Sequence, residues 1–473
     1  MPITKPLMPF DSPMIDEADD VEIEISEDTI STPTEDGGIV IQFGADEDED
    51  TQDDVDHNAN LAELIDESDL EGMAAELVDD FTNDRNSRKD WAMAYIKGLD
   101  LLGLKIEERS QPWQGASGVF HPMLTESVVR FQAQAMGELF PASGPVRSKI
   151  MGKATDEKIR QAQRVETELN YLLTEKMPDY RSELEQLLFR LPLAGSAFKK
   201  VYFDPIREVP VASFVPAEDL VASYGASSLE TCPRFTHVMR KTKNEILELQ
   251  AVGFYRDVDI GLPTADKSDI QDKYDDLEGT DDTMFDDGRY TILEMYVDIN
   301  MPEDFDDPDG IARPHVITIE KGSMTILSIR RNWREEDEKK RKRMHIIHYP
   351  YLPGLGFYGT GLIHLIGGLA KSATSIMRQL IDAGTLANLP AGLKSRGLRI
   401  KGDNTPLRPG EFRDVDVPGG AIRDAITFLP YKEPSAVLYS LLGNVVEEGR
   451  RIGSVADVQI SDMNSQAPVG TTL

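Results

Sequence analysis

The sequence predicts an α+β fold, because helical and strand-like hydrophobic spacing occupy separate stretches of the 473-residue chain. In residues 61–110, apolar residues recur at intervals of three or four, and Trp91, Tyr95 and Leu99 form one such series. In FTHVMRK, residues 235–241, apolar and polar residues alternate, as they do in half-buried strands. Helices and strands do not follow one another in regular βαβ order, so we expect no parallel sheet wound with helices.

The expected elements can be placed along the chain. Two helices are expected within 61–110, one over 122–141, and two over 157–195 with a break near Pro178 and an end at Gly195. Strands are expected over 198–205, 209–216 and 235–241, then a short helix over 241–254 and an acidic surface loop or linker over 261–289. A compact set of strands follows over 290–299, 314–322 and 325–333. One long helix over 360–387, further strands over 390–430 and a helix over 435–453 complete the order.

The first 60 residues are strongly acidic. They hold 19 of the 84 Asp and Glu residues but a single basic residue, Lys5, and so carry about half of the net charge of −34. Such a composition, with few aromatic residues, is typical of a solvated, disordered tail. An acidic arm that docks on a basic partner is the alternative.

Cysteine content and hydropathy indicate the cellular compartment of the protein. A single cysteine, Cys232, excludes a disulfide framework within the chain and suits a reducing cell interior. No apolar segment typical of a secretory signal opens the sequence. The longest apolar run, near LIHLIGGLA, is far shorter than the ~20 residues of a membrane span. We therefore expect a soluble protein, made in the cytoplasm, with no membrane span.

The segment YLPGLGFYGTG, residues 351–361, contains the spacing G-x-G-x-x-G at Gly354, Gly356 and Gly359. An expected strand precedes it and the long helix follows, which is the order of a dinucleotide-binding fingerprint. That fingerprint also needs a second strand ending in an acid, but the candidate acid, Asp382, falls inside the helical pattern. A turn that needs positive φ and lets backbones approach closely explains the glycines better. We interpret the segment, with Gly361, as a hinge into the helix, where missing side chains could admit a neighbouring subunit.

Motifs typical of enzymes are missing from the sequence. The pair Gly152-Lys153 is followed by Ala154, so it is no phosphate-binding loop. His345 and His348 are expected on opposite faces of a strand, and no His or Cys cluster has metal-ligand spacing. The sequence thus predicts no catalytic residue, no metal site and no cofactor. A nucleotide-binding enzyme stays a remote alternative.

Two further features suggest contacts between molecules. One is a basic cluster around Trp333, interpreted either as a solvated charged loop or as a site for phosphate or an acidic partner; its members are Arg330, Arg331, Arg334, Lys339, Lys340, Arg341, Lys342 and Arg343. The other is the small-residue content of the long helix, which lets another helix approach closely; it includes Gly367, Gly368, Ser372 and Ser375.

From about residue 84 onward the chain resembles the portal proteins of tailed bacteriophages, in the branch of the short-tailed phages. The resemblance rests on five stretches in the family's order, which are QPWQGASGVFHPMLTESVVRFQAQAMGELFP, LPLAGSAFKKVYFDP, FVPAEDLVASYGASSLETCPRFTHVMRKTKNEI, PYLPGLGFYGTGLIHLIGGLAKSATSIMRQLIDAG and MNSQAPVGTT. It implies a non-enzymatic subunit with a mixed α/β wing, a long stem helix and a small β clip, assembling into a ring.

The resemblance also implies how the chain is divided. The expected parts are the acidic tail (1–60), the wing (61–260 and 388–434), the acidic loop (261–289), the clip (290–343), the strand, hinge and stem helix (344–387), and the tunnel helix and loop (435–473). Portals of this branch usually continue beyond the APVGTT segment into a further helix and a crown, so a chain ending at Leu473 is expected to be a shorter or separately encoded form.

Partners follow from the same resemblance. A homo-oligomeric ring, in the form of a dodecamer, is expected at one capsid vertex of the virion, assembled in the host cytoplasm. Its expected partners are double-stranded DNA bound without sequence specificity, terminase, major capsid and scaffolding proteins, and tail adaptor proteins. The expected contact residues for terminase or DNA are Arg331, Arg334, Lys340, Arg341 and Arg343, and the expected tunnel loop contains Asp462, Asn464, Gln466 and Thr471. Another head–tail adaptor protein is the alternative, although adaptors are usually smaller.

Overall fold

The structure is a computed structural model, and it divides into two units, residues 1–56 and 57–473. In the first unit it describes Asp56 and one antiparallel hairpin, β1 (Ile30–Pro33) with β2 (Ile39–Gln42). In the second it describes residues 57–104, 107–113, 115–204, 207–263, 267–279, 288–301, 310–388 and 431–461, and four short strands between 392 and 428. Most of the expected acidic tail therefore lies outside the described residues, but residues 57–60 belong to the second unit.

The helices that the hydrophobic spacing predicts before residue 260 are all present. They are α1 (Glu67–Ser87), α2 (Lys89–Leu99), α3 (Met123–Leu139), α4 (Asp156–Tyr171), α5 (Tyr180–Ala194) and α6 (Lys243–Ala251). Short helical turns add η1 (Leu61–Glu63), η2 (Asp100–Leu102) and a π-helical turn, η3 (Leu172–Lys176). The long helix is α8 (Leu362–Asn388), and α10 (Ala436–Ser461) follows it. Gly195, with φ of 88°, ends α5 as predicted, because only glycine enters this region freely.

Strands form two larger antiparallel sheets, which confirms the α+β class. One has the order β10-β3-β4 and consists of β10 (Ile346–Pro350), β3 (Ser196–Asp204) and β4 (Val209–Pro216). The other has the order β5-β6-β7-β8-β9, with β5 (Leu220–Ala222), β6 (Arg234–Lys241), β7 (Tyr290–Ile299), β8 (Arg313–Glu320) and β9 (Thr325–Arg331). The short strands between α8 and α10 are β11 (Gly392–Lys394), β12 (Arg399–Ile400), β13 (Val415–Asp416) and β14 (Ile426–Phe428).

Two expectations about the middle of the chain need correction. Residues 261–289 are not all loop, because residues 269–278 form the helix α7 (Asp269–Glu278), with Ser268 as its N-cap. In addition, β7 pairs with β6 along its length, so β7, β8 and β9 continue the sheet that β5 and β6 begin. In sheet topology, residues 290–343 are therefore not a β unit separate from the preceding strands.

Helices cover both faces of the five-stranded sheet. α1 crosses one face from β5 to β9 and buries Leu70, Leu77 and Phe81 there. On the other face, Ile246 of α6 packs in one cluster with Tyr290 of β7. Burial of these apolar side chains provides the main stabilising free energy of the unit.

The outer edge of β9 is closed by a side chain. Asn60 Nδ2 donates to Leu327 O at 3.2 Å, and Ile329 N donates to Asn60 Oδ1 at 2.9 Å. The amide of Asn60 thus makes the two hydrogen bonds that a neighbouring strand would make.

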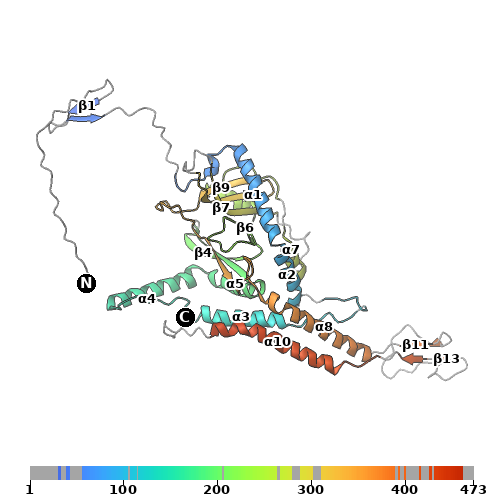
Figure 1. Cartoon of the computed structure of the whole chain (residues 1–473). Coiled ribbons are helices and arrows are strands. Elements are labelled where there is room, and N and C mark those ends of the chain that lie inside the picture. Colours follow the sequence, from blue (N-terminus) through green and yellow to red (C-terminus); the bar gives the residue numbers. More distant parts are fainter. Residues whose placement is uncertain are drawn as a thin grey trace, which may run out of the picture. The chain divides into compact units, whose positions relative to one another are not determined.

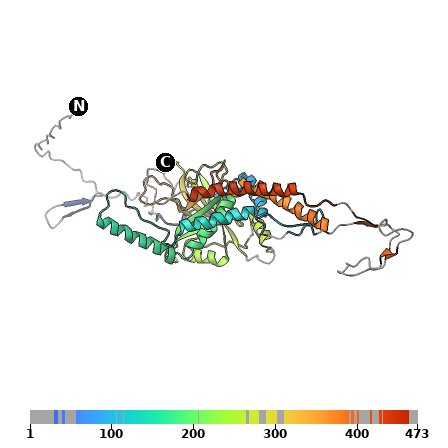
Figure 2. The same cartoon turned by 90° about the horizontal axis from the view of Figure 1, so that it is seen from below.

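Helices α3, α8 and α10 contact one another and lie side by side in both views (Figures 1 and 2). The α3–α10 contact depends on two glycines four residues apart. A Cβ at Gly449 would lie closer than 3.0 Å to Met123 Sδ, and one at Gly453 closer than 3.0 Å to Ser127 Oγ. A side chain at either position would therefore displace Met123 or Ser127 of α3.

Candidate functional site

The glycine junction, residues 351–361, leads from β10 to α8 and docks on the turn between α5 and β3. Tyr351 N donates to Gly195 O at 2.9 Å, and Gly359 N donates to Ser196 Oγ at 2.7 Å. A Cβ at Gly359 or Gly361 would lie closer than 3.0 Å to backbone atoms of that turn. The space predicted there for a neighbouring subunit is therefore filled by the chain itself.

Close approach, rather than positive φ, explains the glycines. None of the four junction glycines has a positive φ. Gly195 of the facing turn does, at 88°. A Cβ at Gly354 would meet the backbone of Tyr358, and one at Gly356 would meet Tyr224, both within 3.0 Å. A hinge motion at this junction stays a prediction.

The topology around the junction differs from that of a dinucleotide fold. β10 pairs antiparallel with β3, whereas the fingerprint needs parallel strands on either side of the helix. Asp382, the candidate ribose ligand, is buried, and its Oδ1 accepts a hydrogen bond from Ser117 N at 2.7 Å. The carboxylate is thus used to fix a loop of the same chain.

A buried arginine, Arg88, which no sequence motif singles out, joins the junction to the turn between β4 and β5. Arg88 Nη1 donates to Ala217 O at 2.7 Å, to Leu220 O at 2.9 Å and to the Tyr358 hydroxyl at 3.0 Å. Its guanidinium lies over the rings of Trp91 and Tyr358, at 5.5 and 5.4 Å from their centres. Arg88 therefore holds the α1–α2 corner, the β4–β5 turn and the junction together.

A buried ionic cluster joins the two sheets. Lys200 Nζ of β3 lies 2.6 Å from both carboxylate oxygens of Glu294 on β7, and His237 Nδ1 of β6 lies 3.2 Å from Oε2. Although burial opposes ionisation, Lys200 and His237 hold the pKa of Glu294 well below its usual range. The cluster is satisfied within the chain and is part of the architecture rather than an exposed reactive site. Lys200 and Glu294 are 94 residues apart, so sequence spacing could not have revealed it.

The basic loop, residues 334–343, starts from a buried tryptophan. Trp333 contacts the rings of His57 and His315, with ring centres 5.8 and 5.2 Å apart. His57 Nε2 also lies 3.2 Å from Trp333 O. The ordered start of the second unit therefore anchors the loop.

Several of the basic residues predicted to contact terminase or DNA contact other residues of the same chain. Arg331 donates to His57 O at 3.4 Å, Lys340 Nζ lies 5.7 Å from the Trp333 ring centre, and Arg341 Nε pairs with Asp337 at 2.9 Å. Arg334 and Arg343 are exposed and form no ion pair with another described residue. These two are the members of the predicted set best placed to reach a partner, and that contact stays a prediction.

The long helix α8 has one buried and one exposed face. Its buried face includes Ile366, Ala370 and Gly367, and a Cβ at Gly367 would lie 3.7 Å from Leu101 Cδ1. Gly367 therefore packs inside the chain. The other residues predicted to pack against a second subunit, Gly368, Ser372 and Ser375, are exposed.

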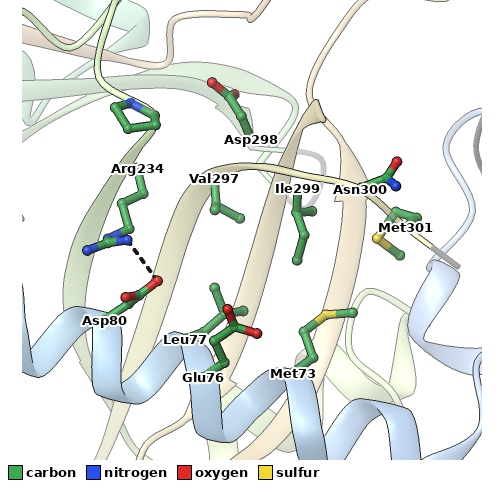
Figure 3. Close-up of a pocket in the computed structure, with 11 residues that line it drawn as sticks. Met73, Glu76, Leu77, Asp80, Arg234, Val297, Asp298, Ile299, Asn300 and Met301 are labelled. Atoms are coloured by element: carbon green, nitrogen blue, oxygen red, sulfur yellow. Dashed lines mark hydrogen bonds and ion pairs between the residues drawn. The ribbon is translucent and has the colours of Figure 1, made fainter. Parts of the chain in front are cut away.

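A groove of about 460 Å³ opens between α1 and the end of β7, with Met73 and Val297 on its apolar walls (Figure 3). At one end, Arg234 pairs with Asp80 and Asp84, each at 2.8 Å. The lining side chains that the structure describes include no nucleophile beside a base. The ion pairs of Arg234 bind α1 to β6, and the described lining of the groove does not suggest a catalytic site.

The remaining expectations concern a metal site, a membrane span and the tunnel loop. Within the described ranges, no group of three or more His, Cys, Asp or Glu side chains could hold a metal ion. No helix in the described part of the chain is long and apolar enough to cross a membrane. The predicted tunnel-loop residues Asp462, Asn464, Gln466 and Thr471 lie outside the described residues.

Comparison with known protein families identifies the class of protein to which this chain belongs. A family model described as phage SU10 portal protein matches residues 145–448, from the segment before α4 to a point within α10. Fold and match together define a phage portal protein, and portal proteins are structural rather than enzymatic. The chain belongs to the SU10 portal protein family; SU10 is a short-tailed phage, so the predicted resemblance is confirmed. None of the curated proteins compared with the chain matches it.

Membership of the portal family has general implications. It implies an oligomeric ring, a place at a capsid vertex of the virion, and interaction with capsid, terminase and tail proteins. It also supports roles in DNA packaging and in connecting head and tail.

Proposed function

We propose that this chain is the repeating subunit of a ring, a dodecamer, through which terminase pumps double-stranded DNA into the capsid and through which the DNA later leaves. The observation that carries the proposal is the portal family match over residues 145–448. The net charge of −34 supports it, because each phosphate neutralised by Lys or Arg strengthens binding and a broadly basic channel would retain the genome. Contacts to the DNA backbone alone suffice for a conduit that does not read sequence.

The parts of the subunit are proposed as follows. Residues 61–260 and 388–434 form the wing, α8 with the glycine junction forms the stem, and residues 435–473 form the tunnel segment. Residues 290–343 form the clip, although their strands continue the sheet that β5 and β6 of the wing begin. The length of α8 and its exposed face with Gly368, Ser372 and Ser375 support a stem that packs against neighbouring copies. The exposed Arg334 and Arg343 support a clip that meets terminase and later the tail adaptor proteins.

The ring is tested by negative-stain electron microscopy of the purified full-length chain. Rings with a central hole are the expected result. A chain that stays monomeric under all assembly conditions, including added scaffolding and capsid proteins from the same phage, would contradict the proposal.

The basic loop is tested in a packaging assay with terminase. Arg334→Glu combined with Arg343→Glu should leave rings intact and reduce packaging at least about tenfold, the equivalent of 1.4 kcal/mol in partner affinity. The matched control is Lys97→Glu with Lys243→Glu, which makes the same charge change at exposed positions on α2 and α6. Equal packaging by both double variants would remove the basic loop from the proposed contact.

A further inference from the structure

Residues 147–164, which lead into α4 and form its first half, are basic in an acidic chain. They hold six basic and two acidic residues, a net charge of +4, whereas the whole chain carries −34. We call residues 147–164 the basic arm. A local excess of positive charge on an acidic protein marks the place where a polyanion can approach it.

The cations of the basic arm are not used by the fold. All six are exposed, and none forms an ion pair with another residue that the structure describes; they are Arg147, Lys149, Lys153, Lys158, Arg160 and Arg164. The basic cluster around Trp333 has the same net charge over residues 330–343, but several of its cations are engaged within the chain. Arg331 donates to His57 O, Arg341 to Asp337, and Lys342 to Cys232 O. The arm therefore presents more unpaired cations than the basic cluster does.

The carboxylates of the arm and its surroundings, by contrast, have structural roles. Asp156 and Glu157 lie in the first turn of α4, where negative charge favours the helix dipole. Glu166 Oε2 accepts hydrogen bonds from Ser148 N at 3.0 Å and from Ser148 Oγ at 2.9 Å. These acids stabilise the local fold, so they leave the cations available to a partner.

The arm is accessible along its length. The segment before α4 lies alongside the helix, because Val146 N and O bond the amide of Asn170, each at 3.0 Å. Arg160 and Arg164 are one turn apart and share a face of α4. No side chain of α4 is buried by the residues that the structure describes, and Figures 1 and 2 show α4 running away from β3 and β4. The cations are thus spread along an exposed rod rather than gathered in a pocket.

We propose that the basic arm binds the phosphate backbone of double-stranded DNA without reading its sequence. Cations spread along a rod match a continuous row of phosphates, and each contact releases counterions from the DNA. The exposed Gln161 and Gln163 lie between the arginines of α4, where their amides can donate to phosphate oxygens. In the proposed ring every copy presents one arm, so individually weak contacts add. The inference rests on the proposed function and names a site for the DNA that a portal handles.

DNA binding by the assembled full-length chain tests the arm. Fluorescence anisotropy of a labelled duplex measures the affinity over a range of salt concentrations. Arg160→Gln with Arg164→Gln should lower the affinity at low salt by about tenfold or more, and should reduce the magnitude of the slope of log K against log salt by about 2. Glutamine is a good helix former, so α4 should persist in this variant.

Two further variants serve as controls. Lys97→Gln with Lys243→Gln makes the same charge change at exposed positions on α2 and α6, and it should leave DNA binding unchanged. Arg160→Lys with Arg164→Lys should bind DNA nearly as well as the native chain, because phosphate contact depends on the charge. Equal DNA affinity in the arm variant and the α2–α6 control would overturn the proposal.

The outcomes separate the arm from the ring. Rings that bind DNA independently of Arg160 and Arg164 overturn the arm and leave the portal function standing. Chains that form no rings, but bind DNA through these arginines, support the arm and contradict the ring. If a labelled polyglutamate peptide needs the arginines for binding and DNA does not, the partner is an acidic protein and the proposal is wrong.

Discussion

The basic loop and the glycine junction lie on either side of β10 in the sequence and are built in opposite ways. In the junction, backbone meets backbone, since Gly359 and Gly361 press on the α5–β3 turn. In the basic loop, long side chains make the contacts, as in the Arg341–Asp337 pair, while Arg334 and Arg343 extend into solvent. Substitution in the junction is therefore limited by the space around each glycine. In the basic loop it is limited mainly by the charge of the exposed side chains.

The largest expected effect is at Gly359. Gly359→Ala should lower the free energy of unfolding by about 3 kcal/mol or more, because the new Cβ would overlap Gly195 O and Leu352 O and the backbones would have to separate. Urea unfolding followed by tryptophan fluorescence measures it, since Trp91 stacks on Tyr358 of the junction.

Gly368 provides the matched control. A Cβ there would meet nothing within 4 Å, so Gly368→Ala should stabilise α8 by about 0.5–1 kcal/mol. If both alanine variants unfold at the same urea concentration, close backbone approach is not what fixes glycine in the junction.

The next effect is expected at Arg88. Arg88→Met keeps much of the side-chain volume but removes the hydrogen bonds to Ala217 O, Leu220 O and the Tyr358 hydroxyl, which should cost about 3 kcal/mol of unfolding free energy. Arg130→Met, at an exposed arginine paired with Glu126, should cost less than about 1 kcal/mol. A similar cost in the two variants would show that the buried arginine does not join the junction to the β4–β5 turn.

Acid should weaken the junction through His348. This ring stacks on Phe198 and Phe357, and burial lowers its pKa to about 4 from an ordinary value near 6.5. The unfolded chain then binds more protons than the folded chain between these pH values, so stability falls as pH falls through this window. At pH 5 the loss should be on the order of 1–2 kcal/mol relative to pH 7.5.

Urea unfolding at several pH values measures this loss. His348→Gln cannot take up the proton, so its stability should change less between pH 7.5 and pH 5. His345 and His364 also have pKa values lowered by burial, so a residual slope of the same sign is expected in the variant. An unchanged pH dependence in His348→Gln would exclude His348 as its source.

The smallest effects are expected in the basic loop. Arg334→Glu and Arg343→Glu should each change the free energy of unfolding by less than about 0.5 kcal/mol, because both residues are exposed. Lys342→Met should cost about 1 kcal/mol, since its ammonium donates to Cys232 O at 2.8 Å and pairs with Asp298 at 3.1 Å. Urea unfolding measures these costs. Equal losses of unfolding free energy at all three positions would show that Lys342 stabilises the fold no more than the exposed Arg334 and Arg343 do.

Local structure was largely predictable from the sequence, because it follows from hydrophobic spacing and from Gly and Pro positions. One exception is α7, which has more acidic than apolar residues, a composition that predicts a loop. Ile270, Tyr274 and Leu277 nevertheless recur at helical spacing, and the Tyr274 hydroxyl lies 2.8 Å from that of Tyr95 on α2. The Ser268 cap and Gly279, with φ of 71°, were signals that could have revealed the helix.

Contacts between distant elements were not predictable in the same way. Pairing of β6 with β7 depends on which strand edge is free, and a strand pattern states only which residues face a core. Gly449 and Gly453 give no hint of their partners Met123 and Ser127 on α3. Among the candidate contact residues, the sequence identified the basic cluster, but only the fold distinguishes Arg334 and Arg343 from Arg341, which is paired with Asp337.

The amide of Asn60 at the edge of β9 has a consequence for a chain that assembles with its own copies. An open sheet edge pairs with any extended segment, and copies gathered at high local concentration would join edge to edge in competition with ring closure. The Asn60 amide occupies Leu327 O and Ile329 N, and Arg256 N also donates to Leu327 O at 2.8 Å, so these edge groups are not free to pair with a strand of another copy. The first folded residues of the second unit thereby protect the subunit against polymerising in the wrong geometry.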